Sequence, residues 1–311
     1  MVLVVAANPS IDRTLHVPFL RVGQVHRPTR VFPGAGGKGL NVARAARVLG
    51  LPARVTGCLA GHTGALVADL AREEGLDARW HLLPLGETRT CVLLNHDQGD
   101  STVLNEPGPH LDPADWLAFH RLVEELAGGV RAVVLAGSVP PSVDPEAYAA
   151  LCRALVRRVG RVYVDTPGPP LAALVRNPVG LAIKVNRAEL AEALGQPLEE
   201  PGRLVAALRA LLGAGAAMVG VTLGAQGAVV ATADGAWRGT SLAGPLVSSV
   251  GSGDSFLAGL VAAEVAGLPL TEGLRLACAC GAANAETPLP GRFEADRVAA
   301  LRAGATVERL G

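Results

Sequence analysis

The feature that most constrains the fold is a regular alternation of short apolar runs with longer segments of helical periodicity. Six apolar runs predict core strands, at residues 2–7, 54–59, 132–136, 161–165, 181–185 and 217–222. Helical patterns lie between them, at 39–49, 63–74, 113–127, 144–158, 186–194 and 203–213. Such alternation predicts parallel βαβ units. We therefore expect an α/β fold of the doubly wound kind, with a mainly parallel sheet and helices on both faces.

Two segments interrupt this alternation. Residues 12–32 and 88–105 have the pattern of β-hairpins with no helix between their strands, the second around the turn signal NHDQGD. We expect them to form a small separate β-sheet, inserted in a single domain that spans 1–311. A small sheet beside a large open one is suited to act as a lid over a site at the strand ends. Its apolar face would need a partner, which favours a homodimer.

Composition argues against several classes of function. The formal net charge is zero and the basic residues form no dense cluster, which argues against a nucleic-acid surface. The five cysteines include no CxxC pair, which favours buried thiols in a reducing cytosol over a metal site. The most apolar long run, 204–221, contains Arg209 and predicts a helix and a strand rather than a membrane span. We expect a cytoplasmic protein with no membrane contact.

The stretch SSVGSGDSFLAGLVAAEVAG, residues 248–267, carries the clearest chemistry. Gly251, Ser252 and Gly253 are small, and Asp254 opens an almost wholly apolar helix. Glycines at a helix start let backbone N–H groups converge on an anion, and the helix dipole adds positive potential there. Asp254 could then accept a proton from an attacking hydroxyl, as in kinases. The residues alone also fit an ordinary helix cap in a glycine-rich turn.

Two further motifs admit two interpretations each. In KVNRAEL, residues 184–190, Lys184 could bind nucleotide phosphates while Asn186 and Glu189 hold a hydrated Mg²⁺. The same Asn and Glu spacing is also a capping box, which needs no ligand. VTLGAQGAVV, residues 221–230, could cradle a nucleotide, or it could be an ordinary hairpin.

The segment GAGGKG, residues 34–39, contains one of only two lysines in the chain. The other lysine is Lys184, and the remaining basic residues are arginines. The segment is not a P-loop, because that motif would need Gly at 32 and Ser or Thr at 39, where the chain has Phe32 and Gly39. Its glycines would permit close backbone approach to a ligand, and Lys38 would offer a compact positive charge to a phosphate.

Six motifs together give the chain a strong resemblance. NPSIDRT, GGKGLNVARA, AGSVPP, KVNRAEL, TLGAQGA and VGSGDSFLAG occur in this order from residue 8 to about 260. In order and spacing they resemble the pfkB/ribokinase-type carbohydrate kinases, and within that family the sugar-phosphate kinases. The resemblance implies a ribokinase-like core with a β-sheet lid, often paired between two subunits, and it implies ATP and Mg²⁺ as cofactors.

The resemblance also implies a role for each matching residue. Asp254 would be the catalytic base, and Gly251, Ser252 and Gly253 would form the anion hole. The sugar phosphate would be bound by Asp12, Gly37, Lys38, Asn41, Arg89 and Ser138. ATP would be bound by Lys184, Asn186, Thr222, Gly224 and Gly227, with Asn284 near the adenine. Asn186 and Glu189 would organise Mg²⁺, largely through water.

The expected reaction follows from these roles. Kinases of free sugars in this family need no phosphate ligand, so Lys38 and Arg89 favour a substrate that already carries phosphate. The leading expectation is ATP-dependent conversion of fructose 1-phosphate to fructose 1,6-bisphosphate. Tagatose 6-phosphate and fructose 6-phosphate are close alternatives, and the sequence does not decide between the C1 and C6 hydroxyls. More distant alternatives are a nucleoside or vitamin kinase and a non-catalytic sugar-phosphate sensor on the same fold.

Overall fold

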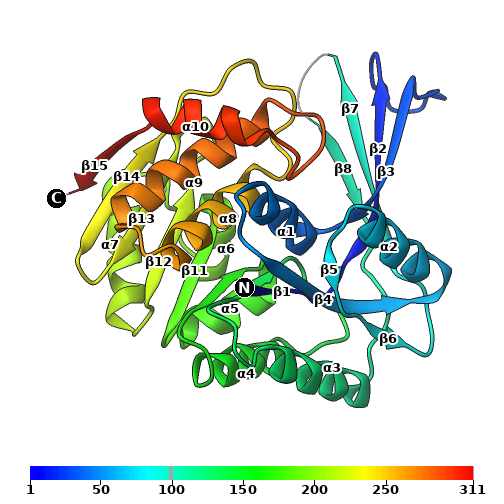
Figure 1. The fold of residues 1–311 in the computed structure, drawn as a ribbon, viewed down its shortest axis with the longest axis horizontal. Helices are drawn as coiled ribbons and strands as arrows, with labels where there is room; N and C mark the ends of the chain where they lie inside the picture. Colours follow the sequence, from blue (N-terminus) through cyan, green and yellow to red (C-terminus); the bar gives the residue numbers. More distant parts are fainter. Residues whose placement is uncertain (98–100, 311) are drawn as a thin grey trace.

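The computed structural model describes residues 1–97 and 101–310, which form two β-sheets and the helices that cover them (Figure 1). The main sheet contains β1 (Val2–Ala6), β4 (Ala53–Ala60), β5 (Asp77–Ala78), β6 (His81–Leu83), β9 (Val133–Ala136), β10 (Val162–Asp165), β11 (Leu181–Asn186), β12 (Met218–Thr222), β13 (Ala228–Thr232), β14 (Gly235–Thr240) and β15 (Thr306–Leu310). The small sheet contains β2 (Ser10–Val17), β3 (Arg30–Gly36), β7 (Arg89–His96) and β8 (Thr102–Asn105). The helices are α1 (Lys38–Val48), α2 (Gly61–Glu73), α3 (Pro113–Leu126), α4 (Pro145–Val156), α5 (Gly168–Arg176), α6 (Arg187–Leu194), α7 (Pro201–Gly213), α8 (Ser252–Val265), α9 (Leu270–Ala285) and α10 (Ala295–Gly304).

The strand order of the main sheet confirms the doubly wound α/β prediction. The order is β15-β14-β13-β12-β11-β10-β9-β1-β4-β5, with β6 beside β4. Pairing is parallel from β12 to β5, and β13, β14 and β15 add an antiparallel edge. The chain extends the sheet from β1 to one side through β4, and later to the other side through β9. The order therefore reverses between β1 and β9, and in open α/β sheets ligands bind at such a reversal.

Apolar layers cover both faces of the main sheet. Val2 and Val4 of β1 pack in the layer that includes residues of α1, α8 and α9. Leu3 and Val5, which alternate with them, pack in the layer that includes residues of α3, α4 and α7. This two-faced burial explains why the central strands are continuous apolar runs rather than alternating ones.

The small sheet projects from the main body (Figure 1). Both predicted hairpins are present, because β2 pairs with β3 and β7 pairs with β8 in antiparallel register. Residues 98–100 of the predicted NHDQGD turn lie outside the described residues. The two hairpins join through a parallel pairing of β2 with β7, which gives the order β3-β2-β7-β8.

Most residues of helix α8 are buried, and the helix packs against α1, α9 and β11. A Cβ at Gly259 would lie 2.7 Å from the Cα of Ala277, so the absence of a side chain lets α8 approach α9 closely. At its far end, Glu264 accepts hydrogen bonds from Arg161 at 2.6 Å and from the hydroxyl of Tyr163 on β10. These contacts fix α8 relative to the strand that ends at the candidate site.

Within the described residues, no helix combines the length and apolar character needed to cross a membrane. The five cysteines are buried and carry free thiols.

Candidate active site

The candidate site lies where the N-termini of α1 and α8 meet the carboxyl ends of the central strands. Each helix begins after a glycine with a positive φ, 101° at Gly37 and 83° at Gly251. Among the described residues, no side chain caps the N-terminus of α1 or of α8. Backbone N–H groups at these two N-termini are therefore left to bind an anion. A Cβ at Gly251 would lie 2.4 Å from the Cβ of Pro290, so this position requires glycine twice over.

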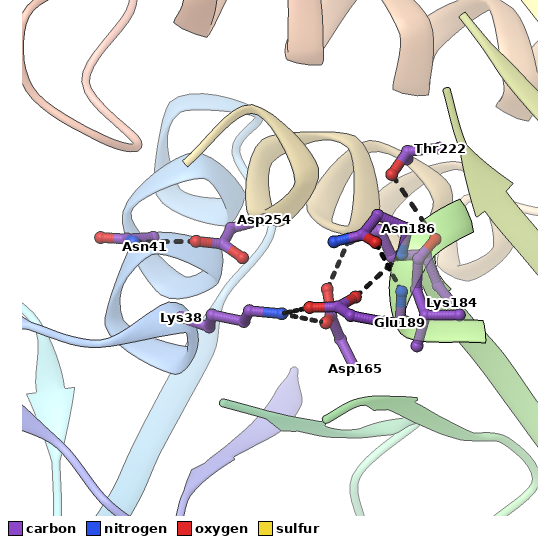
Figure 2. Close-up of polar contacts among 9 residues, drawn as sticks. Lys38, Asn41, Asp165, Lys184, Asn186, Glu189, Thr222 and Asp254 are labelled. Carbon is purple, nitrogen blue, oxygen red and sulfur yellow. Dashed lines mark hydrogen bonds and ion pairs between the residues drawn. The ribbon is translucent and has the colours of Figure 1, made fainter. Parts of the chain in front are cut away.

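Asp254 lies in the first turn of α8 and is 5% exposed. One of its carboxylate oxygens accepts a 2.8 Å hydrogen bond from the amide nitrogen of Asn41 on α1 (Figure 2). Burial raises the pKa of Asp254 to about 6, and the negative charge of Asp165 adds to the rise, against the opposing charges of Lys38 and Lys184. A carboxylate with this pKa is ionised at neutral pH and is basic enough to accept a proton.

The centre of the site is a fully buried carboxylate between the two lysines of the chain. Lys38 Nζ lies 2.7 Å from one oxygen of Asp165, and Lys184 Nζ lies 2.5 Å from the other (Figure 2). Burial alone would raise the pKa of Asp165, but the charges of Lys184 and Lys38 outweigh it and lower that pKa to about 2. Asp165 is not among the site residues predicted from the sequence, although an acid at the end of an apolar strand was a usable signal.

Lys184 also adjoins the glycine-rich loop. A Cβ at Gly253 would lie only 2.8 Å from Lys184 Nζ, so the ammonium group stands directly against the start of α8. Of the predicted anion-hole amides, that of Ser252 donates to the carbonyl of Ser249 at 3.2 Å. Among the described residues, the amides of Gly251 and Gly253 make no such backbone hydrogen bond, so they are candidate donors together with the neighbouring Lys184.

Asn186 and Glu189 form the capping box that was one of the two interpretations. The side chain of Asn186 accepts a hydrogen bond from the backbone N–H of Glu189 at 2.8 Å, and the side chain of Glu189 accepts one from the backbone N–H of Asn186 at 2.9 Å. The second oxygen of Glu189 accepts a hydrogen bond from Lys38 at 3.2 Å. Since Asp165 and Glu189 share the Lys38 ammonium, their carboxylates lie close enough together to serve one cation.

The predicted sugar-side residues gather around the segment that enters β2. Asp12 accepts a 2.7 Å hydrogen bond from Ser10, and burial raises the pKa of its carboxyl. The side-chain amide of Asn8 donates a hydrogen bond to the hydroxyl of Ser138 at 3.3 Å. The main-chain carbonyl of Asn8 accepts a hydrogen bond from Arg89 at 3.2 Å. These residues lie at the root of the small sheet, while Lys38 reaches to the other side, toward Asp165.

A Cβ at Gly37 would lie 3.5 Å from the Cα of Pro9, so Gly37 belongs to the same group.

Three of the predicted nucleotide-binding residues, Thr222, Gly224 and Gly227, lie together at the end of β12 and in the turn that follows it. Thr222 pairs in register with Asn186 at the ends of β12 and β11, next to the 3₁₀ turn that begins at Gly224. A Cβ at Gly227 would lie 2.0 Å from the carbonyl oxygen of Gly239, so this tight turn requires glycine.

Asn284, which was predicted to lie near the adenine, makes its contacts in this structure with protein groups. It is fully buried, and its amide donates to the carbonyl of Val250 at 2.8 Å and to Ser252 at 3.1 Å. Its oxygen accepts from Ser255 and from the Gly291 amide. In this conformation Asn284 holds the loop before α8 and has no surface to offer a ligand.

Known proteins resemble this chain over nearly its whole length. Residues 2–294 match the pfkB family of carbohydrate kinases. The chain belongs to this family. A curated protein named 1-phosphofructokinase from Rhodobacter capsulatus is 38% identical over 98% of this chain and 97% of its own length. A second protein of that name, from Bacillus subtilis, is 33% identical over 92% of both chains.

Two solved structures share the fold over nearly the whole chain. A possible 1-phosphofructokinase from Thermotoga maritima has a TM-score of 0.90 at 26% identity, covering 100% of both chains. Phosphofructokinase-2 from Escherichia coli, in complex with substrates and products, has a TM-score of 0.89 at 25% identity, covering 97% of this chain and 98% of its own. The family resemblance and the ribokinase-like fold predicted from the sequence are both confirmed.

Proposed function

We propose that this pfkB-family chain is an ATP-dependent kinase that converts fructose 1-phosphate to fructose 1,6-bisphosphate. The observation that carries the reaction type is the buried carboxylate of Asp254 in the first turn of the uncapped helix α8, beside Lys184. The choice of sugar phosphate is supported by the two curated relatives named 1-phosphofructokinase, which are 38% and 33% identical over nearly the whole chain.

In this proposal Asp254 acts as the general base. It accepts the proton of the C6 hydroxyl as that oxygen bonds to the γ-phosphorus of ATP, and the bond from the γ-phosphorus to the bridging oxygen breaks to release ADP. Because the pKa of Asp254 is about 6, the base is ionised before the sugar arrives and needs no further activation. The hydrogen bond from Asn41 holds one oxygen of the Asp254 carboxylate in place, while the other oxygen is available to accept the proton.

Charge on the transferred group would be stabilised by donors already in position. The amides of Gly251 and Gly253 lie at the start of α8, and the ammonium of Lys184 stands against Gly253. Donors of this kind contribute most when the closed site excludes water. Lys38 shares Asp165 with Lys184, so its charge also serves this reacting end. Arg89 and Ser138, at the root of the small sheet, would then bind the phosphate group that the sugar carries, in place of Lys38.

The residues present suit a hydrated Mg²⁺ ion. Asp165 and Glu189 both bind Lys38 Nζ, and Mg²⁺ usually takes one or two carboxylates plus water and substrate phosphates. When bound, the ion would neutralise charge on the β- and γ-phosphates. Asp165, Glu189 and Asn186 would hold it, with water between some of the partners. Thr222, Gly224 and Gly227 would border the nucleotide at the neighbouring strand end.

The small sheet would act as the lid and as the contact between two subunits of a homodimer. Lid closure over Asp12 and Arg89 would exclude water and so limit hydrolysis of ATP. With ATP as phosphoryl donor, we expect the reaction to take place in the cytoplasm.

Steady-state kinetics with fructose 1-phosphate, fructose 6-phosphate and tagatose 6-phosphate test the substrate. We expect the highest kcat/KM for fructose 1-phosphate, and a clear preference for free fructose or a nucleoside would contradict the proposal.

The variant Asp254→Asn tests whether Asp254 is the general base. It should lower kcat by about 10²- to 10⁴-fold while fructose 1-phosphate still binds in calorimetry. Near-normal turnover of this variant would exclude Asp254 as the base.

A further inference from the structure

Asn41 has both ends of its amide occupied by protein groups. Its nitrogen donates to Asp254 at 2.8 Å, and its oxygen accepts from Arg44 Nη1 at 3.0 Å, one helical turn further along α1. Asn41 is 4% exposed, so little of it can meet a ligand. Asn41 is one of the residues predicted to bind the sugar phosphate, and in this structure its side-chain amide contacts the proposed base and a buried arginine.

Arg44 is buried to the same degree and uses all three nitrogens of its guanidinium group. Besides Asn41, it donates through Nε and Nη2 to the two oxygens of Glu74, at 2.5 and 3.0 Å, and through Nη2 to the carbonyl of Ala35. Arg292 reaches Glu74 from the surface at 3.0 Å. The guanidinium group is thus fixed in direction, with Glu74 as its anchor.

This arrangement determines which way the Asn41 amide faces. An asparagine amide has nearly the same shape in its two flipped orientations, so packing alone does not select one. Arginine is a donor at every nitrogen, so only the oxygen end of Asn41 can face Arg44. The NH₂ end is then directed at Asp254, which as an ionised carboxylate can only accept.

We propose that Arg44 is a positioning residue for phosphoryl transfer, because it holds the Asn41 amide in the one orientation that donates to Asp254. This inference rests on the proposed role of Asp254 as general base. Arg44 does not touch the reacting atoms, and its own charge is balanced by Glu74. It acts through Asn41, by fixing the direction of the carboxylate and favouring its ionised form.

The role requires arginine rather than any buried cation. Three separately directed nitrogens reach Glu74, Ala35 and Asn41 at once, whereas a lysine has a single nitrogen that cannot span these partners. The pocket is closed by Gly291, where a Cβ would lie 3.1 Å from Arg44 Cβ and 2.7 Å from the carbonyl oxygen of Asn41.

Arg44→Lys is the direct test, with kcat and KM measured from pH 5 to 9. The variant keeps a cation for Glu74 but frees the Asn41 amide. We expect kcat to fall by about 10- to 100-fold, since small misplacements of a catalytic group cost up to about that factor, while KM for both substrates changes less than about threefold. The acidic limb of kcat/KM should move to higher pH, because a hydrogen bond to the ionised carboxylate is weakened.

The other charged groups that face Asp254 are Asp165, Lys38 and Lys184, and all three are unchanged in this variant.

A double-variant cycle separates positioning from a general structural effect. If Arg44 acts through Asn41, Arg44→Lys should lower kcat little further in an Asn41→Ala background. Arg292→Met is the matched control, because it removes the outer contact to Glu74 and leaves Arg44 bound to Asn41; it should keep the parent kcat and pH profile. Should Arg44→Lys fail to fold, Glu74→Gln weakens the anchor instead and should shift the same limb with a smaller loss of kcat.

Parent-like kcat and pH dependence in Arg44→Lys, or full additivity in the cycle, would overturn the inference while Asp254→Asn remains inactive. An active Asp254→Asn variant would instead overturn the proposed base, and the inference with it. The two failures are therefore distinguishable.

Discussion

At the scale of single residues, the charge state of Asp254 controls the expected pH dependence of the reaction. The base must be ionised, and its pKa of about 6 in the free protein comes first from burial and then from Asp165. We expect kcat/KM to be level above this value and to fall tenfold per pH unit below it. In Asp165→Asn the limb should move to lower pH, because loss of a neighbouring negative charge favours ionised Asp254. An unmoved limb would show that another group titrates.

The same burial should make Asp254 costly for stability. Its folded-state pKa lies above the ordinary value of 3.8, so the folded state binds its proton more tightly between these values, and stability falls as pH rises through that window. Asp254→Asn removes this cost. We expect a higher Tm than the parent at pH 8 and a smaller difference at pH 4, measured by thermal unfolding of both proteins in the same buffers. A lower Tm of the variant at pH 8 would contradict this.

Asp165 has the opposite effect on the pH dependence of stability, because its pKa is lowered in the folded protein rather than raised. Its pKa is held near 2, so the ion pairs it makes stabilise the fold above pH 4 and are lost only as pH falls toward 2.

At the scale of elements, the approach of α8 to β11 depends on a missing side chain. Gly253→Ala would place a methyl group 2.8 Å from Lys184 Nζ and push that ammonium group away from the start of the helix. We expect kcat to fall by about 10²- to 10³-fold, as for loss of one anion-hole donor, with little change in Tm because alanine favours the helix. Gly202→Ala on α7, which has open space around it, is the control and should behave like the parent. Parent-like kcat in Gly253→Ala would argue against this donor set.

The elements also show what the sequence could and could not predict. Apolar periodicity located the core strands and most helices within a few residues, because those segments are buried on one or both faces. Helix α5 was not predicted, since its first turn, GPPL, carries two prolines and has the composition of a turn. The partners of Asn41 and Asn284 were not predictable either. Asp254, the partner of Asn41 on α8, lies 213 residues away along the chain. Val250, a partner of Asn284 in the loop before α8, lies 34 residues away, and only tertiary packing brings these groups together.

At the scale of the whole molecule, the small sheet exposes apolar side chains on both of its faces. Phe32 is 38% exposed and Leu104 is 58% exposed, and the pairing register places them on opposite faces. A sheet of this kind needs a covering surface, and a second copy of the same sheet would provide one. Sedimentation velocity at micromolar concentration should therefore give the mass of a dimer.

The variant Phe32→Glu/Leu104→Glu should be monomeric, because each face would have to bury a charge on association. Its KM for fructose 1-phosphate should rise, since Asp12 and Arg89 lie at the root of the same sheet and depend on its position, while far-ultraviolet circular dichroism should match the parent. Leu117→Glu on the outer side of α3, a similarly exposed leucine far from this sheet, should leave the dimer intact. A monomeric parent, or a double variant that still sediments as a dimer, would show that the sheet is not the contact between subunits.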